Sequence, residues 1–506
     1  MLDVETDEIR TGSLPRVLLL LAVPLVAQNL ALVAQQVVDL FWVGRLGGEA
    51  VAAVGLSSVV VGLAMVPVLV FAVGSQVVTA QRVGAGSIER ARLVPVNAAG
   101  GAVLVTVVVG AGLVGFAPAV VDLFGTSEAV ANMAVAYLTA YSLALVATGA
   151  SDALESGFTG WGDMRAAFLV NATAIAVNVV VDPLLILGYW GFPEWGVAGA
   201  AVATAVGYAV GAGLALGLAV RGRGDFRLTR AAIAPDLATV REILDVGLPI
   251  AGQNTGRQVA RLLVVAVVSL VAGGPGLAAY HIGAQVATVA FVPAQGLGQA
   301  ATSVVGQNLG ARSPDRARRT TWLAVAIAAG GLAVLGAVQW LGPAAIARVF
   351  VPDLSGQALA YAVTYLEVLA YGYPALGVIY AVEAGFNGAN RTKVSMYSTL
   401  LQYWAVRLPL AAGGVVLLEF GVEAVFWAVT LSNVAAAVWL LAYFRYTTAR
   451  GLLRRAAEEA ASGDETPSVD ARGVADASGA ATETGSSGPA AAERQGEGSS
   501  EEPAVD

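Results

Sequence analysis

Two acidic residues stand inside long apolar stretches of the chain. Asp39 lies within residues 35–44, and Asp182 lies within residues 178–188. If these stretches cross a membrane, each carboxylate costs roughly 2.5–3.5 kcal/mol on insertion scales. Charged groups in membrane spans usually belong to a pathway for ions, protons or substrates. Asp39 and Asp182 are therefore the first candidates for function.

The residues near Asp182 add further oxygen atoms. Asn178 precedes it by four positions, on the same helical face, and Pro183 removes a backbone donor and can free a carbonyl oxygen. With the hydroxyl of Thr204, the set offers only oxygen ligands, which hard cations such as Na⁺ prefer. A desolvated carboxyl group can instead carry a proton near neutral pH. Either chemistry makes Asp39, Asn178, Asp182 and Thr204 a candidate coupling-ion site.

Composition predicts that these residues lie in a membrane protein. Only 13% of the residues are charged and 57% are hydrophobic, whereas soluble domains carry roughly 25% charged residues. A helix of about 20 apolar residues crosses a bilayer. The sequence predicts an all-α polytopic fold with twelve such spans, at 17–43, 52–80, 93–118, 130–154, 165–190, 195–220, 243–272, 278–306, 320–346, 358–384, 393–418 and 421–446.

Basic residues orient the spans. Twenty-one Arg and Lys residues fall at the N-terminus, in the even-numbered loops and after the last span, whereas the other side has only Arg45 and Arg348. Cytoplasmic loops carry the excess of basic residues. Both termini are therefore expected in the cytoplasm, with the chain in the plasma membrane.

The two halves of the chain repeat each other. Residues 24–29 match 249–254, and residues 155–160 match 383–388, at offsets of 225 and 228. Because each unit has six spans, both copies point the same way, as a parallel repeat of two six-helix lobes. Asp39 and Asp182 have no acidic counterpart, since Val264 and Leu408 occupy those places, so the scaffold does not require them. Two structural explanations stay open: Asp39 could pair with Arg45, and Asp182 could cap a broken helix.

These boundaries define the domains. We expect a cytoplasmic N-terminus at 1–15, an N-lobe at 16–222, a cytoplasmic linker at 223–240 and a C-lobe at 241–447. Residues 448–506 form a cytoplasmic tail. From about 456 the tail has twelve acids, two bases and no aromatic residue, a composition typical of disorder.

Several motifs, in order and at matching spacings, resemble those of the MATE family of multidrug and toxin extrusion transporters. They begin at Asp39-Leu-Phe-Trp-Val-Gly44, Gln81-Arg-Val-Gly84-Ala85, Asn178-Val-Val-Val-Asp182-Pro183 and Gln307-Asn-Leu-Gly310-Ala311. The resemblance covers residues 16–447. It implies an H⁺- or Na⁺-coupled antiporter that exports amphipathic, often cationic compounds by alternating access.

The acidic pattern resembles DinF-like and archaeal members of the family, whose ion site lies in the N-lobe. NorM-like members carry acids in the seventh and tenth spans, whereas this chain has Gln253-Asn-Thr-Gly-Arg257 and Leu376-Gly-Val-Ile-Tyr380 there. The resemblance therefore favours the N-lobe site.

The remaining polar residues of the spans fall into two candidate groups. Those that could line a substrate cavity, or serve as hydrogen-bonding glue between helices, are Gln28, Gln35, Gln36, Tyr137, Tyr141, Gln253, Asn254 and Arg257. Those with a structural or gating role are Glu155, Glu383, Pro183, Arg261 and Arg407. The arginines could also snorkel, pair with Glu383 or Glu367, or line a cavity.

Other functions find little support. The chain has no Cys, a single His and no phosphate-binding loop, so we expect neither an enzyme nor direct use of ATP. Its bases flank membrane spans, so nucleic acid is not an expected partner. We expect a monomer with no cofactor other than the coupling ion. The alternative is a flippase or exporter for a lipid-linked saccharide or another narrow substrate, which would need a strongly cationic cavity.

The predicted orientation can be tested with single cysteines, because the chain has none of its own. Ser127→Cys and Ser355→Cys lie in loops expected outside the cell, so a membrane-impermeant maleimide should label both in intact cells. Ser313→Cys should react only after permeabilisation. Labelling of Ser313→Cys in intact cells would contradict the orientation.

Overall fold

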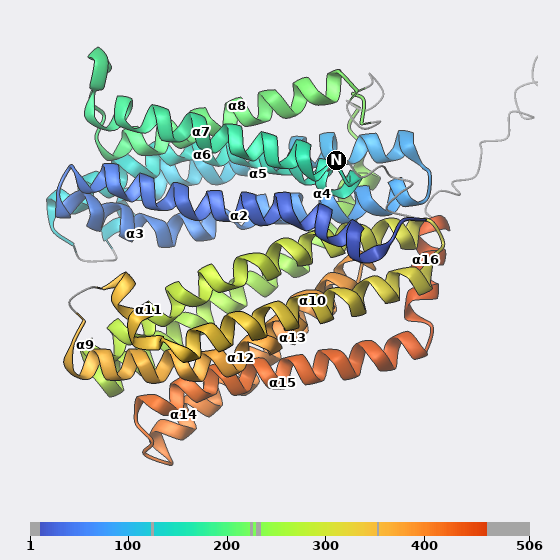
Figure 1. The fold of residues 1–506 in the computed structure, drawn as a ribbon. Helices are drawn as coiled ribbons and strands as arrows, with labels where there is room; N and C mark the ends of the chain where they lie inside the picture. Colours follow the sequence, from blue (N-terminus) through green and yellow to red (C-terminus); the bar gives the residue numbers. More distant parts are fainter. Residues whose placement is uncertain (1–10, 123–125, 223–225, 229–233, 352–353, 463–506) are drawn as a thin grey trace, which may run out of the picture. The chain divides into compact units, whose positions relative to one another are not determined.

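The regular elements of the described residues are all helical. A computed structural model of the chain describes residues 11–122, 126–222, 226–228, 234–351 and 354–462 (Figure 1). The elements are α2 (Leu14–Gly44), α3 (Gly48–Ala64), α4 (Val66–Gly84), α5 (Ile88–Asp122), α6 (Glu128–Trp161), α7 (Met164–Leu187), the 3₁₀ turn η1 (Tyr189–Gly191), α8 (Val197–Val220), α9 (Leu237–Gly310), α10 (Pro314–Leu341), α11 (Pro343–Phe350), α12 (Gly356–Gly388), α13 (Thr392–Leu400), the π-helix η4 (Leu401–Arg407), α14 (Leu408–Val416), α15 (Val422–Ala449) and α16 (Leu452–Ser462).

These helices supply the twelve predicted spans. Ten are long and apolar enough to cross a membrane. One of them, α9, has 74 residues and bends at Gly273, whose φ of +52° favours glycine, so it makes two spans. The eleventh span consists of α13, η4 and α14 in succession. In the second span, α3 and α4 meet at Met65, one residue before the first turn of α4, which contains Pro67.

The helices form two groups that follow the sequence repeat. In the first, α6 packs against α5 and α8, and α7 packs against α8; in the second, α12 packs against α10 and α15. The first group is blue to green in Figure 1, and the second is yellow to orange-red. The predicted lobes, N-lobe and C-lobe, are therefore present.

The lobes join through a reciprocal pair of hydrogen bonds. We call the end of the bundle where α2, α5, α10 and α13 begin the basic end, because Arg82, Arg316 and Arg391 lie there. At this end, the amide of Gln81 in α4 donates to the carbonyl oxygen of Gly388 in α12 at 3.0 Å. The amide of Gln307 in α9 donates to the carbonyl oxygen of Gly160 in α6 at 2.9 Å. These four residues form what we call the glutamine clasp.

The glutamine clasp depends on a close backbone approach of α4 to α9. A Cβ atom added at Gly84 would lie 2.0 Å from the carbonyl oxygen of Gln307, and one at Gly310 would lie 2.0 Å from that of Gln81. Neither position can carry a side chain unless the helices move apart, because real Cβ contacts are longer than 3.0 Å. The two glycines are equivalent in the repeat, so the contact is nearly symmetric.

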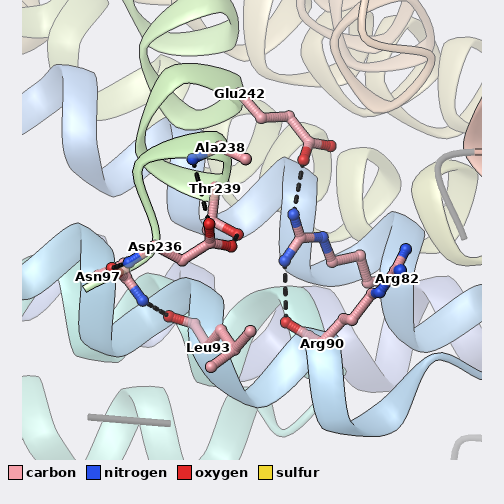
Figure 2. A network of polar contacts seen from close by, with 8 residues as sticks. All are labelled: Arg82, Arg90, Leu93, Asn97, Asp236, Ala238, Thr239 and Glu242. Carbon is pink, nitrogen blue, oxygen red and sulfur yellow. Dashed lines mark hydrogen bonds and ion pairs between the residues drawn. The ribbon is translucent and has the colours of Figure 1, made fainter. Parts of the chain in front are cut away.

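The start of α9, where the predicted linker passes into the predicted C-lobe, is bound to the N-lobe (Figure 2). The backbone N–H of Asp236 donates to Oδ1 of Asn97 in α5 at 2.8 Å, and Arg82 in α4 pairs with Glu242 at 2.7 Å. Asp236 also caps α9 by accepting from the N–H of Ala238. A hydrogen bond from the Thr239 hydroxyl lowers the pKa of Asp236, which keeps this cap ionised.

The C-terminal helix α16 packs at the same end. Its residues Leu452, Leu453, Ala456 and Ala457 are buried against the C-lobe, and Glu459 pairs with Arg391 at 2.7 Å. Order therefore extends to Ser462, past the position near 456 where disorder was expected, because the small apolar residues recur at helical spacing. The rest of the acidic tail, at 463–506, lies outside the described residues, as do residues 1–10 and parts of the linker.

A side chain at Gly310 should weaken the close contact between α4 and α9 at the basic end. Gly310→Val places carbon against the carbonyl oxygen of Gln81, so the two lobes should separate there. Spin labels can be attached to cysteines that replace Glu89 and Arg318. Pulsed electron paramagnetic resonance should then give a longer distance between the labels with Gly310→Val than without it. Gly330→Val is the matched control, since a Cβ at Gly330 meets nothing within 4 Å. Equal distances in the two variants would contradict the role of this contact.

Candidate functional site

The two predicted acids come together between α2 and α7. Asp182 is fully buried, with 0% of its surface exposed, and Asp39 is half-buried. Their carboxyl groups are near enough to interact electrostatically. Two carboxylates that lie this close repel each other when both are ionised, and a proton or a cation shared between them relieves that repulsion. The pair is therefore suited to hold one proton or one small cation.

Asn178 links the acids to their polar neighbours. Its Oδ1 accepts from Nε2 of Gln35 at 2.8 Å, and its Nδ2 donates to Oδ1 of Asp182 at 3.3 Å and to the hydroxyl of Thr204 at 3.5 Å. With the oxygen and nitrogen of its amide exchanged, Asn178 donates to Oδ1 of Asp39 at 3.1 Å. Asn178 therefore lies between the two carboxyl groups, within hydrogen-bonding distance of each.

One oxygen of the site has no partner. Oδ2 of Asp182 is buried and accepts no hydrogen bond from any described residue. A buried polar atom without a partner costs about 1–3 kcal/mol, and a bound cation or an added proton would remove that cost. Within the part of the chain that the structure describes, no three His, Cys, Asp or Glu side chains are grouped. A set with two carboxyl groups suits a monovalent cation or a proton.

Neither structural explanation of the acids fits the geometry. Arg45 lies over the rings of Phe41 and Trp42, at 4.9 and 5.6 Å from their centroids, and forms no ion pair with Asp39. Asp182 does not end a helix, because α7 continues through Pro183 to Leu187. Both acids therefore lie in the interior of their helices.

A half-buried acid that the sequence analysis missed lies on α6. Asp152 interacts electrostatically with Glu155, one turn further along, and with Tyr141 and Tyr208. The repeat could have revealed it, because its counterpart at an offset of 228 is Tyr380, which carries no charge. The predicted Tyr137 and Tyr141 stack on each other, with ring centroids 5.7 Å apart, and line the same interior.

Two predicted residues of the cavity group form pairs with the predicted structural acids. Gln28 donates to Oε1 of Glu155 at 2.9 Å, and Gln253 donates to Oε1 of Glu383 at 3.1 Å. The pairs are equivalent in the repeat, and each ties the first helix of its lobe to the fourth. The amide nitrogens of both glutamines are therefore committed to interhelical bonds.

Equivalent residues also support the two acids from a third helix. Asn171 donates to Glu155 at 3.5 Å, and Thr399 donates to Glu383 at 3.4 Å, again at an offset of 228. The symmetry of these contacts supports a structural role for Glu155 and Glu383.

The predicted arginines gather on one cavity of the C-lobe. Arg257, Arg261 and Arg407 line it, together with Asn254. Asn254 accepts from Arg257 at 2.6 Å. No ion pair joins these arginines to Glu383 or Glu367 among the described residues. Gln36, the last predicted cavity residue, is exposed on α2.

A family model described as MatE matches the chain twice, over residues 24–184 and 249–412. The two matches fall on the two copies of the repeat. The probable multidrug resistance protein NorM of Thermotoga maritima is 27% identical over 415 residues, which are 80% of this chain and 86% of that protein. The corresponding NorM of Pseudomonas aeruginosa is 28% identical over 463 residues, or 88% and 92% of the two chains.

A solved structure shares the fold. A MOP superfamily transporter from Pyrococcus furiosus, described as having a binding pocket of reverse polarity that suggests a different function, superposes with a TM-score of 0.79. It is 23% identical and covers 87% of this chain and 97% of its own. At that identity the likeness concerns the fold alone.

Removing one glutamine of the symmetric pairs should destabilise the protein. Gln28→Leu leaves Glu155 buried with one donor fewer, which should cost about 1–3 kcal/mol of unfolding free energy. Thermal unfolding of the purified protein, followed by tryptophan fluorescence, measures the change. Asn29→Leu is the control, because the one partner of Asn29 among the described residues is the carbonyl oxygen of Leu25 in its own helix. Equal unfolding temperatures for the two variants would refute the structural role of the pair.

Proposed function

Because the chain belongs to the MatE family of multidrug transporters, we propose that it exports amphipathic, often cationic compounds in exchange for H⁺ or Na⁺. As a member of that family it is a multi-pass membrane transporter and not an enzyme. We place it with the DinF-like and archaeal type, as a monomer in the plasma membrane that needs no cofactor other than the coupling ion.

The observation that carries the proposal is the shared, incompletely bonded pair of Asp39 and Asp182. It lies in one lobe only, Asp182 is fully buried, and one oxygen of Asp182 is free to accept a proton or a cation. Asn178 lies within hydrogen-bonding distance of both carboxyl groups, and Thr204 adds a hydroxyl beside it.

Coupling requires that ion and drug favour different arrangements of the lobes. Binding of a proton or Na⁺ between α2 and α7 fixes the relative position of these helices, because it satisfies oxygens on both. A drug that binds between the lobes would instead need the arrangement in which α2 and α7 are not fixed by a bound ion. The stacked Tyr137 and Tyr141 provide an aromatic wall for it, next to the acids.

Closure at the basic end gives the direction of access. We assign that end to the cytoplasm, following the excess of basic residues there. With the glutamine clasp formed, a drug cannot pass between the lobes on that side, so the state described here is closed to the cytoplasm. Opening of the clasp then accompanies uptake of drug from inside the cell.

The lipid-linked saccharide flippase is the second candidate, and its supporting observation is the arginine-lined cavity of the C-lobe. A flippase needs a cationic cavity large enough for a lipid-linked saccharide. The arginine-lined cavity is lined by C-lobe residues alone and has a volume of about 340 Å³, which is small for such a substrate. Family membership favours drug export.

Neutralising the buried acid should abolish coupled transport. Asp182→Asn cannot exchange a proton and binds a cation weakly, so ethidium efflux from vesicles should fall at least tenfold. The vesicles carry an imposed Na⁺ gradient or an imposed proton gradient, applied separately. The gradient that drives efflux in the unmodified protein identifies the coupling ion.

The matched control is Glu423→Gln, an acid exposed at the start of α15 and remote from the site. It should transport normally. Full efflux by an inserted, folded Asp182→Asn variant would exclude the pair as the coupling site. Absence of efflux from the unmodified protein under both gradients would favour the narrow-substrate alternative.

A further inference from the structure

The C-lobe cavity combines positive charge with an aromatic wall. Its volume is about 340 Å³. Arg257 and Arg261 reach it from α9, and Arg407 reaches it from η4, whereas Glu383 is the one acid among its lining residues. Among the described residues, no carboxylate oxygen lies within 4.0 Å of any of the three guanidinium groups.

The partners of Arg407 are neutral. Its Nε donates to the hydroxyl of Ser432 at 2.9 Å, and one terminal nitrogen donates to Oδ1 of Asn433 at 2.6 Å. The guanidinium lies 3.9 Å from the ring centroid of Tyr403. Only 6% of the side chain is exposed. These contacts fix the orientation of the guanidinium but do not cancel its charge.

The local backbone presents these groups to the cavity. Residues Leu401–Arg407 form a π-helix in the middle of the eleventh span, and wide turns of this kind are frequent at functional sites. Gln402, Tyr403 and Arg407 of this segment all line the cavity. The π-helix therefore presents the amide of Gln402, the ring of Tyr403 and the guanidinium of Arg407 to the cavity.

The charge balance calls for an anion. Even with Glu383 ionised, the lining has an excess of two positive charges within membrane-spanning helices. Uncompensated charge there is costly, and such residues usually face a partner or a substrate. Arginine suits oxyanions in particular, because its planar fork of N–H groups matches carboxylate and phosphate oxygens.

The rest of the wall suits an apolar body. Tyr280 and Tyr365 stack, with ring centroids 5.5 Å apart, and Phe291 lies beside Tyr380. We propose that this cavity binds an anionic amphiphile, with a carboxylate or phosphate group held by Arg261 and Arg407 and an aromatic or acyl body against the tyrosines. This site is independent of the acidic pair in the N-lobe and does not rest on its coupling role.

Binding can be measured directly on the full-length protein in phosphatidylcholine nanodiscs. Calorimetric titration with 2-naphthoate should show saturable binding, at least tenfold tighter than its neutral analogue 2-naphthamide. Arg261→Gln and Arg407→Gln should each weaken 2-naphthoate binding at least tenfold, as expected for loss of a charge-assisted hydrogen bond. Arg348→Gln, at an exposed arginine of α11 outside the cavity, is the matched control and should bind normally.

A second arm separates a soluble oxyanion from a lipid headgroup. Native mass spectrometry of protein from mixed phosphatidylcholine and phosphatidylglycerol membranes counts retained phosphatidylglycerol. Retention that is lost in Arg261→Gln identifies a lipid phosphate as the occupant, whether or not 2-naphthoate binds. Because Arg261 is exposed on α9, its variant should fold even if Arg407→Gln does not. The proposal is overturned if 2-naphthoate binds no better than 2-naphthamide and phosphatidylglycerol retention is the same in Arg261→Gln and Arg348→Gln.

Discussion

The structure depends on one constraint: in the hydrocarbon core, polar and charged groups must find their partners within the protein. The chain meets it differently in its two lobes. In the N-lobe, Asp39 and Asp182 lie close to each other and within hydrogen-bonding distance of the amide of Asn178. In the C-lobe, Arg407 is held by neutral oxygens and an aromatic ring. The N-lobe arrangement leaves one oxygen of Asp182 without a partner, and the C-lobe arrangement leaves the charge of Arg407 uncompensated. Each lobe therefore has a group that a small ligand or ion of opposite charge could bind.

The duplicated unit separates structural residues from functional ones. The contacts that hold helices together occur twice, in the pairs Gln28–Glu155 and Gln253–Glu383 and in the glutamine clasp. The charged groups that are not shared differ in sign, since the acids lie on the first and fifth helices of the N-lobe, and Arg261 and Arg407 lie on the first and fifth helices of the C-lobe. The two lobes therefore share the contacts that hold their helices together but differ in the charged residues of their interiors.

Much of the fold follows from sequence because membrane spans must be long and apolar. The twelve spans, the repeat and the two lobes were predicted on that basis and are confirmed. The set of Asp39, Asn178, Asp182 and Thr204 also lies together as expected, although its role stays a prediction. Spacing could not foresee the π-helix at 401–407 or the left-handed turn at Gly273, since helical geometry there depends on tertiary packing. Asp152 was missed, although the repeat pairs it with the uncharged Tyr380 and so marks it as an acid present in one half only. The helix that continues over residues 456–462 was not predicted, because the acidic composition of the tail is typical of disorder.

The glycine contact between α4 and α9 has a consequence for how fast and how easily the lobes can separate. Backbone meets backbone there, so reclosing the contact orders no long side chain and loses little rotamer entropy. The two clasp bonds are each worth only about 0.5–1.5 kcal/mol net, and each 1.4 kcal/mol shifts an equilibrium tenfold. A clasp of this strength lies within reach of the free energy that a single bound ion or drug supplies. In the proposed transport cycle, a weakly bound ligand can therefore break the two clasp bonds, and their closure again orders no long side chain.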